Sequence, residues 1–413
     1  MNKLTNDPMR PFPPEEFATR VERVRKAMSK KGIDVLIISD ANNMYWTTGY
    51  SETAAYQKTF IVIAQDDPKP HWIGREFTCA PTAELTTYLE QDQMTTFGEK
   101  FATHTIGLLE SKVDEQETAP DAMGVVADYV KSRGWGNKRV GIEEASRQLP
   151  YRYGCSLRAG LPDATFVDAT FIIEELRVVK SDLEVQVLRQ SAAISNTSMR
   201  STIEMIEPGV RECEVAAEVF RSNVAGTVDY GGFYPEGVVM NVGRRNPAMH
   251  SNWTDQPIPE GELITIEMGS SRYGYNVGHC RAAAIGGVDQ VYLDLSACVN
   301  DAFAAVFEAA VAGNTSHNVA TKFTETLHKG GFKARDWIAY SMGVGLPGQN
   351  WADPADIRLG NEQVLVPNMM FHIVPGFWID GLGWTLLASD SFLIKETGGP
   401  ELMSDVERKI YIR

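Results

Sequence analysis

The 413-residue chain lacks long hydrophobic runs, has few cysteines and is poor in basic residues. No apolar stretch reaches the roughly 18 residues that a membrane-spanning helix needs. Lys and Arg number 39 against 54 Asp and Glu, so the formal net charge is −15, which argues against a protein that binds nucleic-acid phosphates. The polar, proline-rich first residues lack the apolar segment of a secretory signal. We therefore expect a cytoplasmic protein with no membrane or nucleic-acid partner.

Common signatures of metal and nucleophile sites are also missing. The five cysteines are scattered and form no C-x-x-C pair, which favours reduced thiols over disulfides. The sequence contains no H-E-x-x-H and no G-x-S-x-G. His279 and Cys280 are adjacent, so on a strand they would point to opposite faces and could not chelate one ion together.

Hydrophobic periodicity predicts a first domain over residues 1–172. Glu16 to Lys31 has the apolar stripe of an amphipathic helix, and Gly32 follows its end. Short apolar runs over 34–39, 59–63 and 139–143 read as strands, with a helical segment over 119–133 between them. Alternating strands and helices predict an α/β layer domain.

Residues 173–413 show a different pattern. Ser181 and Glu184 form a capping box that opens a long helix running to about Glu204. Further helices are predicted over 212–222, 293–312 and 317–329, and strands over 237–242 and 262–268. We expect an α+β domain in which paired helices back a strongly bent antiparallel sheet.

Two residues of this second part suit proton transfer. Glu267 ends an otherwise apolar strand, where burial would raise its pKa toward neutrality. His250 follows a polar loop and precedes a proline-rich turn, and histidine is the other natural proton carrier. Each also has a structural interpretation: Glu267 as the ion partner of an arginine such as Arg281, and His250 as an ordinary loop histidine.

The stretch from Tyr340 to Pro347 contains two glycines that allow close backbone approach, and the stretch from Met369 to Trp378 carries His372 among aromatics. His372 is either a packed core residue or part of a site. Trp378 and Trp384 either fill the core or wall a small cavity. Cys280 is a buried thiol unless Glu267 or a histidine reaches it.

Taken in order, these stretches resemble the pita-bread superfamily, which includes methionine aminopeptidase, prolidase, aminopeptidase P and creatinase. The features that match in order are Ser181-x-x-Glu184, His250, Gly274-Tyr275 followed by Arg281, Tyr340-Ser-x-Gly, and Met369 to Gly376. The resemblance covers essentially the whole chain. It implies an α/β N-terminal creatinase-like domain over 1–172 and an α+β pita-bread catalytic domain over 173–413.

The resemblance also shows what is missing. Peptidases of this superfamily hold two metal ions with two Asp, one His and two Glu, and these positions fall here on Glu267, Gly278, Met342, Val374 and Ser389. Four of the five offer no suitable ligand for a hard dinuclear centre. We therefore expect no metal, no cofactor and no peptidase activity.

Metal-free relatives imply another chemistry. The ectoine hydrolase branch is similar in having a Glu at the position of Glu267, a Tyr-Ser-x-Gly-x-Gly-like turn and a Met-x-Phe-His strand, and His250 matches the acid/base histidine of creatinase. This implies hydrolysis of a C–N bond in a small zwitterionic metabolite, an ectoine-like cyclic amidine or a creatine-like guanidino compound. The expected catalytic residues are His250, Glu267 and His372, and the expected substrate-binding residues are Arg281, Tyr340, Trp378, Asp380, Tyr56 and Gln57.

Several alternatives stay open. Arg281 either clamps a substrate carboxylate or pairs with Glu267, since arginine forms bidentate pairs with both. The family arrangement implies a homodimer in which the N-terminal domain covers the partner's site, with Tyr56, Gln57 and Lys58 reaching across. The whole chain is alternatively an inactive binding module, or a metalloenzyme with a rearranged site built from Glu267, His279, His372 and Asp390.

Overall fold

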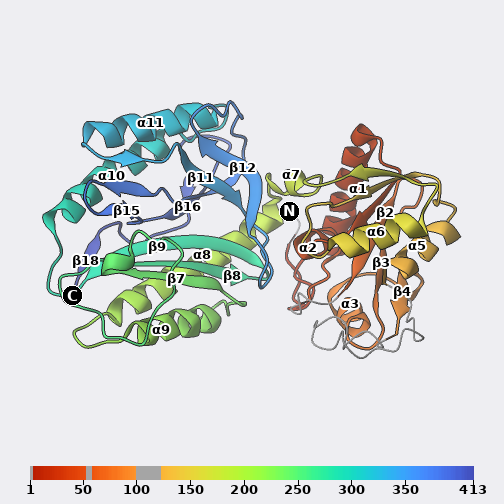
Figure 1. The fold of residues 1–413 in the computed structure, drawn as a ribbon, viewed down its shortest axis with the longest axis horizontal. Coiled ribbons are helices and arrows are strands. Elements are labelled where there is room, and N and C mark those ends of the chain that lie inside the picture. Colours follow the sequence, from red (N-terminus) through yellow and green to blue (C-terminus); the bar gives the residue numbers. More distant parts are fainter. Residues whose placement is uncertain (1–2, 53–57, 99–121) are drawn as a thin grey trace. The chain divides into compact units, whose positions relative to one another are not determined.

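The computed structural model describes residues 3–52, 58–98 and 122–413. The chain separates into two compact units, 1–176 and 177–413, shown in warm and in green-to-blue colours in Figure 1. The boundary expected from the sequence, at residue 172, lies a few residues before this division. Tyr56 and Gln57 lie outside the described residues. No helix in the described ranges is both long and apolar enough to cross a membrane.

In its described residues, the N-terminal unit is an α/β domain built on a six-stranded sheet with the order β4-β3-β2-β1-β5-β6. The central strand β1 pairs with β2 in antiparallel and with β5 in parallel orientation. The strands are β1 (Val35–Ile38), β2 (Phe60–Ala64), β3 (His71–Arg75), β4 (Met94–Phe97), β5 (Arg139–Ile142) and β6 (Thr165–Asp168).

Helices cover this sheet because its strands are apolar. Val35 and Ile37 of β1 share a core cluster with Val126 and Val130 of α5. Gly32, in the left-handed conformation with φ 64°, ends α1 where the sequence predicts. The helices are α1 (Pro14–Lys31), α2 (Ala41–Thr48), α3 (Ala80–Thr86), α5 (Ala122–Ser132), α6 (Tyr151–Gly160) and the short α7 (Glu174–Arg177).

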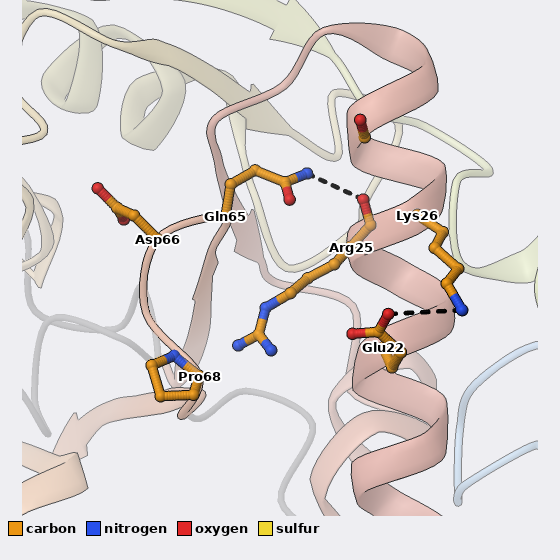
Figure 2. A pocket seen from close by; sticks show the side chains of 7 residues that line it. Glu22, Arg25, Lys26, Gln65, Asp66 and Pro68 are labelled. Atoms are coloured by element: carbon orange, nitrogen blue, oxygen red, sulfur yellow. Dashed lines mark hydrogen bonds and ion pairs between the residues drawn. The ribbon is translucent and has the colours of Figure 1, made fainter.

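A surface hollow lies within this unit between α1 and the turn after β2 (Figure 2). Lys26 Nζ lies 3.4 Å from Glu22 Oε1, and Gln65 donates to the carbonyl of Arg25. The guanidinium of Arg25 donates to the carbonyls of Ala64 and Asp67. The Trp135 indole donates to Asp66 at 3.3 Å, so most polar groups around the hollow already have partners within the protein.

The C-terminal unit holds three antiparallel-rich sheets. Their orders are β18-β9-β8-β7, β12-β11-β13-β16-β17 and β10-β14-β15. The strands are β7 (Glu236–Val242), β8 (Ile264–Arg272), β9 (Tyr275–Ala284), β10 (Lys333–Ala334), β11 (Trp337–Met342), β12 (Ala352–Arg358), β13 (Met370–Ile373), β14 (Phe377–Ile379), β15 (Gly383–Thr385), β16 (Asp390–Leu393), β17 (Glu401–Leu402) and β18 (Ile410–Ile412).

Two helix pairs back the two larger sheets, as expected for a pita-bread domain (Figure 1). α8 (Asp182–Glu204) and α9 (Glu212–Ala225) pack on β7 and β8 through a cluster that includes Met199, Val219 and Ile266. α10 (Gln290–Ala309) and α11 (Ser316–Lys329) pack on β11, β13 and β16 through Phe303 and Phe371. The capping box that opens α8 forms between Ser181 and Glu184, which confirms that prediction.

One strand is longer than the sequence suggests. β8 continues to Arg272 and turns directly into β9, with Arg272 paired to Tyr275. The two residues of the turn, Tyr273 and Gly274, both have positive φ, 48° and 71°. Two-residue turns of this kind usually carry Asn-Gly or Asp-Gly, so Tyr-Gly gave no hairpin signal in the sequence.

Candidate active site

Strand alternation brings Glu267 and His372 onto facing surfaces of the two sheets. In β8, Ile266 and Met268 point to the α8–α9 layer, so Glu267 points to the opposite face. In β13, Phe371 and Ile373 point to the α10–α11 layer, so His372 points away from it. The two side chains meet between the sheets, where Glu267 Oε1 lies 3.7 Å from His372 Nε2.

The surroundings of this pair move both pKa values. The side chain of Glu267 is 14% exposed and that of His372 is fully buried. Burial raises the pKa of Glu267 to about 7 and lowers the pKa of His372 to about 3. Among the described residues, the carboxyl group of Glu267 has no other ion partner. At neutral pH the imidazole is uncharged, while the carboxyl exchanges readily between its two protonation states.

The imidazole of His372 fills the space in front of Gly278. A Cβ atom on residue 278 would lie 2.6 Å from Cε1 and 2.7 Å from both ring nitrogens. Gly278 pairs with Gly269 on the same face of β8 and β9 as Glu267. Gly278 stands where the resemblance puts the second metal-ligating aspartate. An acidic side chain there and the observed position of His372 exclude one another.

Two hydroxyl groups hold the ring of His372. Nδ1 lies 3.0 Å from the Tyr340 hydroxyl, and Nε2 lies 2.8 Å from Ser389 Oγ. Tyr340 is the residue opposite His372 in the pairing of β11 and β13. The Tyr340 oxygen also accepts a hydrogen bond of 2.8 Å from the indole N–H of Trp351, and Trp337 stacks on the Tyr340 ring.

Gly343 and Gly345, which follow Tyr340, allow the loop to bring Trp351 to the Tyr340 hydroxyl. A Cβ atom on Gly345 would lie 2.7 Å from Trp351 Cβ and 2.8 Å from the side-chain nitrogen of Asn276. Asn276 in turn donates to the carbonyls of Gly343 and Gly345. Glycine thus lets the loop fold closely against β9 and bring the indole of Trp351 over the site.

Neither role expected for Arg281 fits its position. Arg281 pairs with Ile266 in the β8–β9 register, so its side chain leaves the sheet on the face opposite to Glu267. The guanidinium is buried and ion-paired with Asp390 at 2.8 Å. It also donates to the carbonyls of Ser389 and Val406. Arg281 ties β9 to β16 and to the C-terminal segment, which corrects its assignment as the partner of Glu267 or a substrate clamp.

The residues considered for a rearranged metal site lie in separate groups. His279 lies on the helix side of β9, between the hydroxyls of Ser195 at 3.3 Å and Ser404 at 2.9 Å. Asp390 is occupied by Arg281 and by Arg408. In the described ranges, no three His, Cys, Asp or Glu side chains come together in a way that could hold a metal ion.

Cys280 lies opposite Glu267 in the β8–β9 register, but its chemistry is unfavourable. Burial, followed by the nearby Glu267 carboxylate, raises the pKa of the thiol well above its usual value. A thiol that resists ionisation is a poor nucleophile. All five cysteines are free.

The remaining predicted residues lie on loops and hairpins rather than beside the pair. His250 is exposed in the turn before Ser251. The neighbouring Met249 lies against Gly376, whose Cβ would be 3.2 Å from the methionine methyl group. The Trp378 indole donates to Asp380 at 2.8 Å, at the tip of the β14–β15 hairpin. Trp378 and Asp380 contact each other, and among the described residues no hydrogen bond joins His250 to Glu267 or His372.

Trp351, Ser389 and Gly278 were not among the residues predicted for the site. Gly278 carried a usable signal, because a glycine inside a strand often marks a close approach by another group. Ser389 was identified only as a lost metal ligand. Trp351 lies beyond a loop from Tyr340, and no periodic pattern links the two.

Two protein-family models match this chain. The chain matches the model of metallopeptidase family M24 over residues 186–396 and that of the creatinase/prolidase N-terminal domain over residues 20–179. The chain belongs to metallopeptidase family M24. It is 30% identical over 394 residues to an uncharacterized hydrolase/peptidase, y4tL, of Sinorhizobium fredii, with 94% of each chain covered.

Two further similarities bear on fold and chemistry. The chain is 29% identical over 413 residues to the ectoine hydrolase of Halomonas elongata, with 98% of each chain covered. An Xaa-Pro dipeptidase structure from Bacillus anthracis superposes with a TM-score of 0.76 at 19% identity, covering 96% of this chain and 100% of that one. The similarity to the dipeptidase structure establishes the fold, and the similarity to the ectoine hydrolase supports a hydrolase.

The metal centre that the family name implies does not fit these residues. Of the five expected ligand positions, Glu267 alone carries a carboxylate, and the imidazole of His372 occupies the space in front of Gly278. Met342 is buried and its sulfur accepts from the Ser391 hydroxyl at 3.3 Å. A hydrolytic mechanism through a dinuclear centre therefore does not fit this site.

Proposed function

We propose that this M24-family protein hydrolyses a C–N bond in a small zwitterionic metabolite without a metal ion. Cyclic amidines such as ectoine are the first candidates, and guanidino compounds such as creatine are the second. The observation that carries the proposal is the position of His372, which fills the place of a metal-ligating side chain at residue 278 and lies beside Glu267. The similarity to an ectoine hydrolase along the full chain supports the choice of substrate class.

In the proposed reaction, Glu267 is the proton carrier. Its ionised carboxylate accepts a proton from the water that attacks the sp² carbon between the two nitrogens. The protonated Glu267 then delivers that proton to the leaving nitrogen, and the C–N bond breaks to give an amide and an amine. A carboxyl with a pKa of about 7 suits both steps near neutral pH.

The other residues bind and orient. Neutral His372 and the Tyr340 hydroxyl offer hydrogen bonds at the reacting centre, while Trp351 and Trp337 supply aromatic surface beside Tyr340. A buried carboxylate without a cationic partner favours a substrate that brings its own positive charge, as an amidinium does. A neutral peptide bond would not supply that charge.

Two parts of the proposal concern residues away from the pair. The family arrangement makes a homodimer the expected assembly. Light scattering on the purified protein measures the assembly, and a monomer at micromolar concentration would remove this part. His250, Trp378 and Asp380 are proposed to shape the entrance of the site.

The test is a proton NMR time course on protein dialysed against EDTA. Ectoine, 5-hydroxyectoine, creatine and an Xaa-Pro dipeptide are supplied separately, each with and without added Mn²⁺. We expect loss of an amidine or guanidino substrate in the presence of EDTA, at a rate that Mn²⁺ does not raise. Glu267→Gln serves as the control for a contaminating activity.

Other outcomes would overturn the proposal. Cleavage of the dipeptide only after Mn²⁺ is added would make the protein a peptidase with an unforeseen metal site. Absence of turnover for every compound, combined with ligand binding by NMR, would favour the alternative of a binding module.

A further inference from the structure

An unbroken series of polar contacts runs from the half-buried Trp351 to Glu267. The indole N–H of Trp351 donates to the Tyr340 oxygen at 2.8 Å, and that oxygen lies 3.0 Å from His372 Nδ1. On the other side of the ring, His372 Nε2 lies 2.8 Å from Ser389 Oγ and 3.7 Å from Glu267 Oε1. Trp351 also lies edge-on to the imidazole, with ring centroids 6.0 Å apart.

The donors and acceptors in this series favour one arrangement of protons. An indole N–H can only donate, so the Tyr340 oxygen is an acceptor toward Trp351. At 3.0 Å from His372 Nδ1, the Tyr340 hydroxyl can direct its own proton at that nitrogen, which leaves the imidazole proton on Nε2, donating to Ser389. In the opposite tautomer the Tyr340 oxygen would accept hydrogen bonds from both Trp351 and His372.

Charge favours the same tautomer. With Glu267 ionised, an N–H on Nε2 is attracted to the carboxylate, whereas a lone pair on Nε2 would be repelled by it. The two arguments are independent, because one concerns Nδ1 and its partners and the other concerns Nε2. Both place the proton on the side of the ring that faces Glu267.

We propose that Trp351 is a positioning residue: through the Tyr340 hydroxyl it holds neutral His372 in the Nε2–H tautomer, with that proton facing Ser389 and Glu267. His372 is then a fixed hydrogen-bond donor rather than a base. This inference rests on the proposed function and gives the two residues different roles. Glu267 moves the proton, and His372 stabilises the negative charge that develops on the attacking oxygen.

The tautomer is measured directly by ¹⁵N NMR of the histidine side chains in protein labelled with ¹⁵N-histidine. The chain has seven histidines, and the spectrum of His372→Gln identifies the resonances of His372. We expect the wild-type ring to carry its proton on Nε2 at neutral pH, without any substrate present. A ring protonated on Nδ1 would overturn the inference, whatever the enzyme hydrolyses.

Matched variants test the role of Trp351. Trp351→Phe removes the indole N–H and keeps an aromatic ring, and we expect the His372 signals to shift toward a mixture of tautomers. Trp337→Phe is the control, because Trp337 also contacts Tyr340, but through ring stacking with the two ring centroids 5.5 Å apart. We expect it to leave the tautomer unchanged. Equal shifts in both variants would show that packing alone sets the tautomer and would refute the role of the indole N–H.

Kinetics give the second measurement once a substrate is known. Loss of one hydrogen bond in the series should lower kcat of Trp351→Phe about tenfold and leave KM within about twofold. Tyr340→Phe removes the hydroxyl itself and should give a tautomer mixture even if Trp351→Phe folds poorly. A Tyr340→Phe spectrum identical to the wild type would overturn the proposal. The absence of turnover with every substrate, beside the expected wild-type tautomer, would count against the proposed function and not against this inference.

Discussion

Replacement of Glu267 by glutamine should abolish turnover and stabilise the protein at alkaline pH. The carboxyl group has a pKa of about 7 in the folded chain and an ordinary value of 4.5 in the unfolded chain. A raised acidic pKa means that the folded state holds the proton more tightly. The stability this contributes is complete below pH 4.5 and is lost as the pH rises through 7. At pH 8 the free energy of unfolding is about 3 kcal/mol lower than at low pH because of this group.

Glutamine cannot ionise, so the Glu267→Gln variant escapes this loss. The difference in free energy of unfolding between the variant and the wild type should shift by about 2 kcal/mol in favour of the variant when the pH is raised from 5 to 8. Urea titrations at the two pH values, read by hydrogen exchange of peptides from β8, report on the C-terminal unit specifically. Comparing the same two proteins at two pH values cancels the pH-independent effects of the amide.

The contradicting result is equally specific. A variant that is destabilised more at pH 8 than at pH 5 would show that Glu267 is held ionised by a partner, as in a structural ion pair. A variant that keeps more than about a tenth of wild-type activity would show that the carboxylate does not move the proton.

Three further outcomes follow from the same geometry. The rate should rise with pH through about 7, where Glu267 ionises. His372 should cause no decrease in rate over this range, because its pKa of about 3 keeps it neutral. A rate that falls above pH 7 would make Glu267 the acid instead. Gly278→Ala should lose activity and about 1–3 kcal/mol of stability, because its Cβ would lie 2.6 Å from the His372 ring. The control is Gly237→Ala in β7, where the space around the Cβ is open. Equal effects of the two substitutions would refute the close approach of His372 to residue 278. His250→Ala should keep activity within about threefold, measured as kcat/KM; a loss of 10²–10⁴ would restore the acid/base role that the sequence suggests.

The elements of the fold were largely predictable because local signals and packing agree. The capping box at Ser181 begins α8 where expected, and Gly32 ends α1. The α/β and α+β character of the two units follows from apolar periodicity, and family matches to both halves agree with it. The hairpin between β8 and β9 was missed because its turn places a tyrosine, Tyr273, at positive φ.

The site was only partly predictable, for a physical reason. Sequence pattern shows that Glu267 is buried, but which side chain faces it depends on how two separate sheets meet. Strand register decides that His372 faces Glu267 and that Arg281 points away from it. The contact from Trp351 to Tyr340 depends on a loop conformation that Gly345 permits, and residue spacing does not reveal it.

The most direct test of the central claim compares turnover with metal content in the same sample. The protein is dialysed against EDTA, its bound metals are quantified by mass spectrometry, and the initial rate is measured with the substrate found by NMR. We expect a wild-type rate that is independent of metal content and a Glu267→Gln rate at background. A rate that rises in proportion to bound metal would contradict a hydrolase built on Glu267 and His372 alone.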